Sequence, residues 1–187
     1  SAIQSISSDH GCTVSYPIDL GDKPEDGIEH CDVVIDFSLR DATLSLAQLA
    51  KEHNKPMVIG TTGHSKEDRH AIEQLSHFIP MVWAGNFSTG VNLLFFLTQQ
   101  AAKVLDLNSG FDPEVIEMHH RLKKDAPSGT ADRLLEILKE SRNASDKDVS
   151  HGREGMPGER KVNEIGSHAL RGGDIVGEPT VMFAGMG

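Results

Sequence analysis

Three short apolar runs decide the fold of this chain: Val33-Val34-Ile35, Met57-Val58-Ile59 and Met81-Val82-Trp83. Apolar runs of this length, without polar residues at alternate positions, are typical of parallel strands that are buried on both faces. The two segments between them, residues 42–52 and 66–77, have the character of amphipathic helices. This order of strands and helices predicts a parallel sheet with right-handed crossover connections.

The pattern changes after Ser88. A helix is expected over about residues 91–105, an alternating strand over residues 114–119, and a further helix in which apolar residues recur at helical spacing from Ala131 onward. The polar residues 141–160 are expected to form a long loop.

Ile165–Arg171 and Asp174–Phe183 flank the pair Gly172-Gly173, a pattern that predicts a β-hairpin. We therefore predict an α/β chain of two domains. Residues 1–88 form an incomplete Rossmann-like, dinucleotide-binding domain with a parallel sheet. Residues 89–187 form an α+β domain with a mixed or antiparallel sheet.

The first domain is called incomplete because a dinucleotide-binding unit normally opens with a strand and a glycine-rich turn. The motif G-x-G-x-x-G does not occur in this sequence. Ser1-Ala2-Ile3-Gln4 resembles the end of a first crossover helix, so we expect both ends of the chain to continue in a longer protein.

Composition argues against several classes of partner. A formal net charge of -10 disfavours nonspecific binding to nucleic acid. No apolar run approaches the ~20 residues that a membrane span requires. The two cysteines, Cys12 and Cys31, form no C-x-x-C pair, which favours a reducing, cytoplasmic setting.

The densest group of reactive side chains lies in the run from Glu117 to Lys123. If residues 114–120 form a strand, Glu117 and His119 point to one face and His120 points to the other. Two histidines on opposite faces are poorly placed to bind one metal ion together, so no metal site is predicted. Histidine exchanges protons near neutral pH, and a lysine ammonium can donate a proton or stabilise negative charge. The alternative is that the two histidines are surface residues in a charged loop and have no catalytic role.

Pro127-Ser128-Gly129-Thr130 is typical of the start of a helix. Free backbone N–H groups at a helix start attract anions, so Gly129 and Thr130 are candidates for binding a carboxylate. Ser128 is the expected N-cap, and a cap without a ligand is the alternative. Two cations, Arg121 and Lys124, add positive charge nearby, and Asp125 is expected either to orient a cation or to cap the turn.

Two further segments follow predicted strands directly. Gly60-Thr61-Thr62 follows the second strand and Ala84-Gly85-Asn86-Phe87 follows the third. Ligands of open α/β sheets bind at this carboxyl edge of the strands. The alternatives are an ordinary strand-to-helix turn for the first segment and a domain hinge for the second.

The string from His119 to Ala131, HHRLKKDAPSGTA, closely resembles the signature of the 4-hydroxy-tetrahydrodipicolinate reductases, also called dihydrodipicolinate reductases. Other segments fall in the family's order and spacing, so that the resemblance covers roughly residues 30–187. They are Val34-Ile35-Asp36-Phe37-Ser38, Gly60-Thr61-Thr62-Gly63, Asn86-Phe87-Ser88-Thr89-Gly90-Val91-Asn92 and Arg171-Gly172-Gly173-Asp174-Ile175-Val176-Gly177-Glu178. Pro179 stands where a histidine is usual in the family.

The resemblance implies a two-domain oxidoreductase of lysine and diaminopimelate biosynthesis. It would reduce 4-hydroxy-tetrahydrodipicolinate, a small dicarboxylate, to tetrahydrodipicolinate with NADH or NADPH and release water. The resemblance also implies that residues 89–187 are a substrate-binding and tetramerisation (oligomerisation) domain, with a homotetramer built through its sheets. The residues implied are His119 and Lys123 for catalysis, His120, Gly129 and Thr130 for substrate, and Gly60, Thr61, Thr62, Ala84, Gly85, Asn86 and Phe87 for cofactor.

Two other functions are carried alongside the reductase. The chain could be a truncated, non-catalytic module that binds a dicarboxylate and assembles without holding NAD(P)H. It could also be a related dehydrogenase that acts on another small acid.

Overall fold

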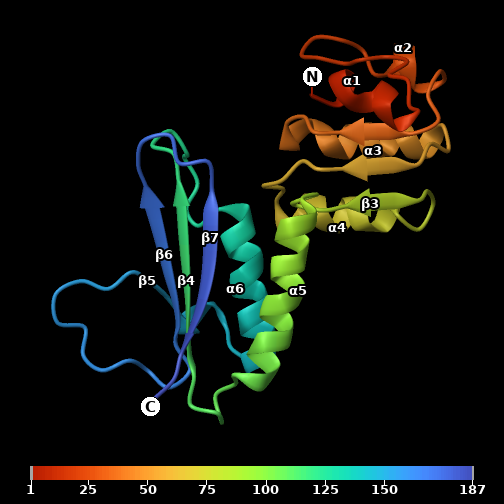
Figure 1. The fold of residues 1–187 in the computed structure, drawn as a ribbon. Coiled ribbons are helices and arrows are strands. Elements are labelled where there is room, and N and C mark those ends of the chain that lie inside the picture. The colour runs from red at the N-terminus through yellow and green to blue at the C-terminus, as the bar shows by residue number, and fades with distance from the viewer. Residues whose placement is uncertain (1, 187) are drawn as a thin grey trace. The chain divides into compact units, whose positions relative to one another are not determined.

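The computed structural model describes residues 2–186 and divides the chain into two compact units, the first ending at Gly85 and the second beginning at Asn86 (Figure 1). The sequence predicted a division three residues further on, after Ser88. The helices and strands of the first unit are α1 (Ala2–Ile6), the 3-10 helix η1 (Ser7–His10), α2 (Glu25–Ile28), β1 (Val34–Asp36), α3 (Arg40–Glu52), β2 (Met57–Ile59), α4 (Lys66–Leu75) and β3 (Met81–Trp83).

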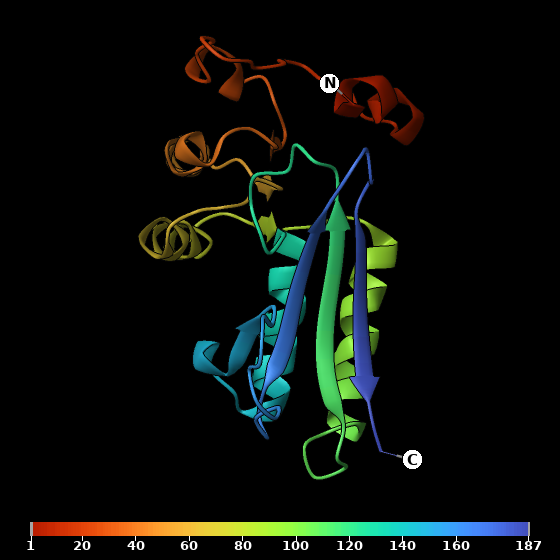
Figure 2. The same ribbon diagram turned by 90° about the vertical axis from the view of Figure 1, so that its left-hand side faces the viewer.

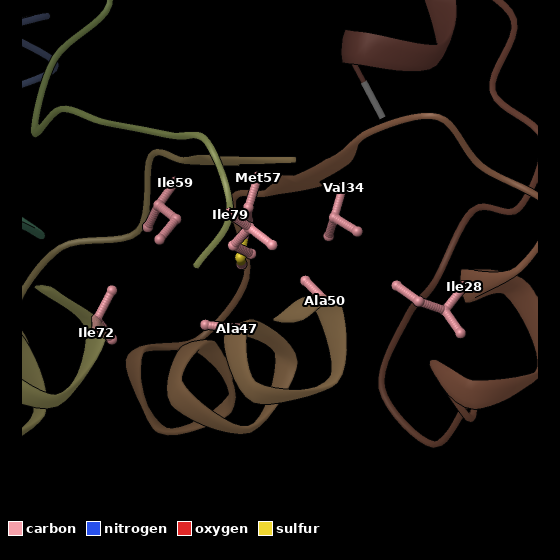
Figure 3. Packing of buried hydrophobic residues seen from close by; sticks show 8 residues of the cluster. All are labelled: Ile28, Val34, Ala47, Ala50, Met57, Ile59, Ile72 and Ile79. Carbon is pink, nitrogen blue, oxygen red and sulfur yellow. The ribbon is translucent and has the colours of Figure 1, made fainter. Parts of the chain in front are cut away.

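The first unit contains the predicted parallel sheet. Its strands lie in the order β1-β2-β3, and both neighbouring pairs are parallel. The crossover helix α4 begins where expected, because the Ser65 side chain accepts a hydrogen bond from the N–H of Asp68 at 3.0 Å. Buried apolar side chains from the strands, the helices and the α4–β3 connection form the core of this unit (Figure 3): Ile28, Val34, Ala47, Ala50, Met57, Ile59, Ile72 and Ile79.

The expectation that these strands are buried on both faces is wrong for this unit. Ile35 and Val82 are 46% and 57% exposed, and both pair in register with Val58 of the central strand. Alternate side chains of a strand point to opposite faces, and α3 and α4 supply the core on one face only. Some apolar side chains of these runs are therefore exposed within the unit.

The second unit is a four-stranded sheet with two helices packed side by side on one face (Figures 1 and 2). Its elements are α5 (Thr89–Val104), β4 (Asp112–His119), α6 (Gly129–Arg142), the 3-10 helix η2 (Asp146–Asp148), β5 (Val149–His151), β6 (Ile165–Arg171) and β7 (Glu178–Ala184). The strand order is β5-β6-β4-β7, with β4 parallel to β6 and antiparallel to β7. The predicted mixed sheet is confirmed.

The predicted hairpin of the last two strands is wrong. β6 and β7 do not pair with each other, because β4 lies between them and pairs with both. Their connection passes the end of β4, where the N–H of Gly172 donates to the carbonyl of His119 at 3.0 Å. The predicted loop over residues 141–160 is also interrupted, since it contains η2 and the short edge strand β5.

Alternation along β4 gives the sheet two different faces. Val115 is fully buried and packs against the helices, with Leu134 and Leu138 of α6 in the same core. Its neighbour Glu114 faces the opposite side, where Arg153 and Arg160 of the β5–β6 connection bind its carboxylate. No helix among residues 2–186 combines the length and apolar character needed to cross a membrane.

Candidate functional site

The residues predicted for catalysis lie where β4 ends and α6 begins. His119 is the last residue of β4, and Ser128 is the N-cap of α6. The Ser128 hydroxyl accepts a hydrogen bond from the N–H of Ala131 at 3.2 Å, which confirms the predicted cap. The loop between them begins with a turn directly after β4, in which the N–H of Lys123 donates to the carbonyl of His120 at 3.1 Å.

A buried carboxylate joins these two elements. Glu117 is 1% exposed, and its Oε2 lies 2.5 Å from His119 Nδ1. Its Oε1 accepts a hydrogen bond from the backbone N–H of Ser128 at 3.1 Å. Arg171 of β6 completes the group, donating Nη1 to Oε2 at 2.9 Å and Nη2 to Oε1 at 2.7 Å. One side chain therefore ties the imidazole to the start of α6.

The environment of Glu117 favours its ionised form. Burial alone would raise the pKa of this carboxyl, but the hydrogen bonds from Arg171, His119 and the Ser128 N–H outweigh burial and lower its pKa. An ionised carboxylate can only accept hydrogen bonds, so each of its partners must supply the proton.

The imidazole of His119 is partly buried, with 17% of its side chain exposed. Its other nitrogen, Nε2, faces Gly177 in the β6–β7 connection. A Cβ atom on Gly177 would lie 3.1 Å from Nε2, and the φ of Gly177 is 138°, a value that L-residues rarely adopt. Glycine at this position therefore leaves room beside the ring.

Lys123 is held by an ion pair within the loop. Its Nζ lies 2.8 Å from Asp125 Oδ2, and its side chain is 20% exposed. The hydrogen bond from Lys123 lowers the pKa of the Asp125 carboxyl. Of the two roles open for Asp125, orienting a cation is the one observed. The side chain of His120 makes no hydrogen bond or ion pair with any residue from 2 to 186, and Arg121 and Lys124 are exposed.

The first backbone N–H groups of α6 are available to a ligand. Within the described chain, the N–H groups of Gly129 and Thr130 donate no hydrogen bond to a protein atom. A Cβ atom on Gly129 would meet nothing within 4 Å, so the space in front of it is open. The hydroxyl of Thr130 accepts a hydrogen bond from Asn86 Nδ2 at 3.4 Å. This arrangement suits an anion at a helix N-terminus.

The predicted cofactor residues of the first unit lie at the carboxyl edge of its sheet. Gly60, Thr61 and Thr62 line a cavity of about 430 Å³ directly after β2. The aromatic ring of Phe37 lies against Gly60, where an added Cβ would come within 2.1 Å of it. Thr61 is buried and its hydroxyl reaches the carbonyl of Asp36 at 3.4 Å, so its side chain contributes to the sheet edge.

The other predicted cofactor residues divide between the two units. Ala84 and Gly85 belong to the first unit, and the N–H of Ala84 donates to the carbonyl of Ile59 at 3.1 Å. Asn86 and Phe87 belong to the second unit. Asn86 bonds to Thr130, which brings one predicted cofactor residue and one predicted substrate residue together.

Two members of the site, Glu117 and Arg171, had no predicted role. The alternation that placed Glu117 on the face of His119 was the available signal for the first. Arg171 is separated from Glu117 by 54 positions, and only the pairing of β4 with β6 brings them together. Among residues 2–186, no three His, Cys, Asp or Glu side chains are grouped so that they could hold a metal ion.

Comparison with known families gives a direct match over nearly the whole chain. The family described as "Dihydrodipicolinate reductase, N-terminus" matches residues 3–87, and "Dihydrodipicolinate reductase, C-terminus" matches residues 90–187. The chain belongs to the dihydrodipicolinate reductase family. The resemblance predicted from the HHRLKKDAPSGTA string is thereby confirmed.

Curated relatives carry the name 4-hydroxy-tetrahydrodipicolinate reductase. The one from Akkermansia muciniphila is 50% identical over 171 residues, covering 90% of this chain and 68% of the relative. The one from Aromatoleum aromaticum is 48% identical over 169 residues, covering 90% of this chain and 60% of the relative. The one from Syntrophotalea carbinolica is 41% identical over 186 residues, covering 97% and 69%. The chain thus spans between 60% and 69% of the length of these dihydrodipicolinate reductases.

A solved structure agrees with the family and the fold. Dipicolinate-bound dihydrodipicolinate reductase from Paenisporosarcina sp. TG-14 superimposes with a TM-score of 0.66 at 26% identity, covering 92% of this chain and 67% of that one. The predicted fold class and the predicted enzyme class, an oxidoreductase, are confirmed. The two other functions, a non-catalytic module and a different small-acid dehydrogenase, are not favoured by these names.

Proposed function

We propose that this chain carries the substrate site and part of the cofactor site of a reductase in lysine and diaminopimelate biosynthesis. It would convert 4-hydroxy-tetrahydrodipicolinate to tetrahydrodipicolinate. One observation supports this most directly: Glu117 binds both His119 and the N–H of Ser128. A proton carrier and an anion-binding helix start are therefore held together at one end of β4.

The substrate is a ring with carboxylate groups, and α6 offers what such a group needs. The free N–H groups of Gly129 and Thr130 would bind one carboxylate, aided by the partial positive charge of the helix start. His120 is the proposed second contact, since its side chain has no partner among residues 2–186. The Paenisporosarcina relative is described as dipicolinate-bound, and dipicolinate is likewise a ring with two carboxylates.

The overall reaction takes up a hydride and a proton and releases water. NADH or NADPH, when bound, supplies the hydride. His119 would give and take protons through Nε2, the nitrogen that Glu117 does not bind. The ammonium of Lys123 would donate a proton and stabilise negative charge that develops on the ring. Asp125 keeps that ammonium in place until a ligand arrives.

The residues at the edge of the first sheet fit part of a dinucleotide. The cavity beside Gly60, Thr61 and Thr62 has the size of a ligand pocket, and it lies at the carboxyl ends of parallel strands. Ala84, Gly85, Asn86 and Phe87 are proposed to complete the contacts to the nicotinamide end of the cofactor.

Removing either proton carrier tests the proposal. His119→Ala and Lys123→Ala are each expected to lower kcat by about 100-fold or more, with the Kd for NADH changed less than about threefold. His70→Ala and Lys147→Ala serve as controls, because both residues are exposed, His70 on α4 of the first unit and Lys147 in η2. Turnover within about twofold of wild type in both test variants would refute the assignment.

Assembly and location are proposed on separate grounds. In the second unit, α5 and α6 leave one face of the sheet open (Figure 2). The strand register puts Leu170 and Met182, which are 45% and 46% accessible, on this face, and we propose it as the contact surface of a homotetramer. Light scattering of wild type and Leu170→Asp checks this, with loss of the tetramer expected in the variant.

Cys12 and Cys31 are both free thiols, in keeping with a cytoplasmic enzyme.

A further inference from the structure

We propose that Glu117, held in place by Arg171, is a positioning residue that fixes the proton of neutral His119 on Nδ1 and leaves Nε2 as the acceptor facing the reaction. This inference rests on the proposed role of His119 and deepens it. It assigns a function to Glu117 and Arg171, which lie outside the HHRLKKDAPSGTA string.

The first support is the geometry of the pair. His119 Nδ1 and Glu117 Oε2 are 2.5 Å apart, and the two residues lie on the same face of β4. Glu117 is ionised and so accepts hydrogen bonds only, which requires Nδ1 to carry the hydrogen. In a neutral imidazole the other nitrogen then has a free lone pair.

The second support is that the carboxylate itself cannot turn. Arg171 binds both of its oxygens, and the N–H of Ser128 binds Oε1. Arg171 is fixed in turn, because its Nη2 donates to the carbonyl of Asp125 and its Nη1 donates to the carbonyl of Leu170, both at 2.7 Å. Only one orientation of the carboxylate satisfies all these donors.

The third support is the surroundings of the imidazole. Glu117 of β4 and Arg171 of β6 are the charged groups on this face, the start of α6 contributes Ser128, and the β6–β7 connection presents Gly177 to Nε2. Because Gly177 carries no side chain, no Cβ atom crowds Nε2. Glu117 therefore acts on the reaction through the ring of His119 rather than by touching the substrate.

Glu117→Gln is the sharpest test, because it preserves shape and turns the atom beside His119 from an acceptor into a donor. Arg171 Nη1, which also donates to that atom in wild type, would keep its hydrogen bond to the Leu170 carbonyl. The Gln oxygen would keep the Oε1 position, where Ser128 and Arg171 donate. The Gln amide would then donate to Nδ1 of His119, and the ring proton would move to Nε2. Long-range ¹H–¹⁵N correlation spectra distinguish the two tautomers. We expect the Nδ1–H form in wild type and the Nε2–H form in Glu117→Gln.

Kinetics of the same variant supply the second readout. A fall in kcat of about 10–100-fold is expected, with KM within about twofold, because a partner that orients a reactive histidine contributes on this scale. Glu114→Gln is the matched control. Glu114 is a buried glutamate of the same strand, bound to two arginines and a histidine, but on the opposite face of the sheet. Its substitution is expected to leave the His119 spectrum unchanged.

The outcomes separate this inference from the proposed function. An Nε2–H tautomer in wild type, or an unchanged tautomer in Glu117→Gln, overturns the positioning role whatever the kinetics show. Normal turnover in His119→Ala overturns the proposed catalytic role, while the spectra still report whether Glu117 sets the tautomer.

Discussion

The charge on Glu114 makes a measurable, pH-dependent contribution to the stability of the second unit. Arg153, Arg160 and His168 bind its carboxylate, and Gly166 on the neighbouring strand leaves the space that it fills. Burial opposes ionisation, but these hydrogen bonds and charges outweigh it and lower the pKa of Glu114 to about 2.

The magnitude follows from linkage. A folded-state pKa of about 2, against an ordinary value of 4.5, corresponds to about 3 kcal/mol of stability at neutral pH. Because the folded value is the lower one, this stability is fully present above pH 4.5 and is lost as the pH falls toward 2. About 2 kcal/mol of it is expected to be gone by about pH 3.

Glu114→Gln removes the charge and keeps the shape. We expect the variant to be less stable than wild type by about 3 kcal/mol near pH 7, and the difference to shrink to about 1 kcal/mol near pH 3. Urea titrations followed by far-ultraviolet circular dichroism measure this. The single tryptophan, Trp83, lies in the first unit, so its fluorescence does not follow the second. Glu159→Gln, on the exposed part of the same connection, is the control. A difference that stays constant over this pH range would refute the reasoning.

Two further predictions concern the core of the second unit and the proposed cofactor-binding edge of the first. Leu134→Ala is expected to cost about 2–5 kcal/mol in urea titrations, since Leu134 is fully buried, whereas Leu122→Ala, at a residue 78% exposed, is expected to cost less than about 0.5 kcal/mol. Gly60→Ala is expected to weaken NADH binding about tenfold by calorimetry, because its Cβ would displace the Phe37 ring. Gly90→Ala lies in α5, outside the proposed cofactor residues, and its Cβ would make an ordinary 3.8 Å contact with Ser88 Oγ. It should bind NADH nearly as wild type does; equal affinities in the two variants would contradict this account.

Much of the first unit was predictable because its signals are local. Three apolar runs and the two helices between them gave the parallel sheet in its observed order. The exposure of one face of the sheet was not predictable from the runs, because burial depends on which other elements cover residues such as Ile35 and Val82. The hydrophobicity of a residue shows that it can be buried, and tertiary packing decides whether it is buried.

In the second unit, local sequence patterns predicted the strand pairing wrongly. Two strand patterns around Gly172-Gly173 favoured a hairpin, but the eight-residue strand β4 lies between them and pairs with both. Whether a strand pairs with its neighbour in sequence or with a distant strand depends on tertiary packing. The residue pattern of one segment carries no information about that packing. The same pairing brings Arg171 to Glu117, so the error in topology and the missed site residue have one cause.

His119 and Lys123, the two proposed proton carriers, differ in how rigidly the fold holds them, because His119 lies on a central strand. β4 is hydrogen-bonded along both edges, and the carbonyl of His119 itself is bound by Gly172, so amide exchange in this strand should be among the slowest in the unit. Lys123 lies on the turn that follows, tied mainly through its ion pair with Asp125. In the proposed reaction, Lys123 would therefore adjust to an arriving ring, and His119 would be the fixed group against which the ring is aligned.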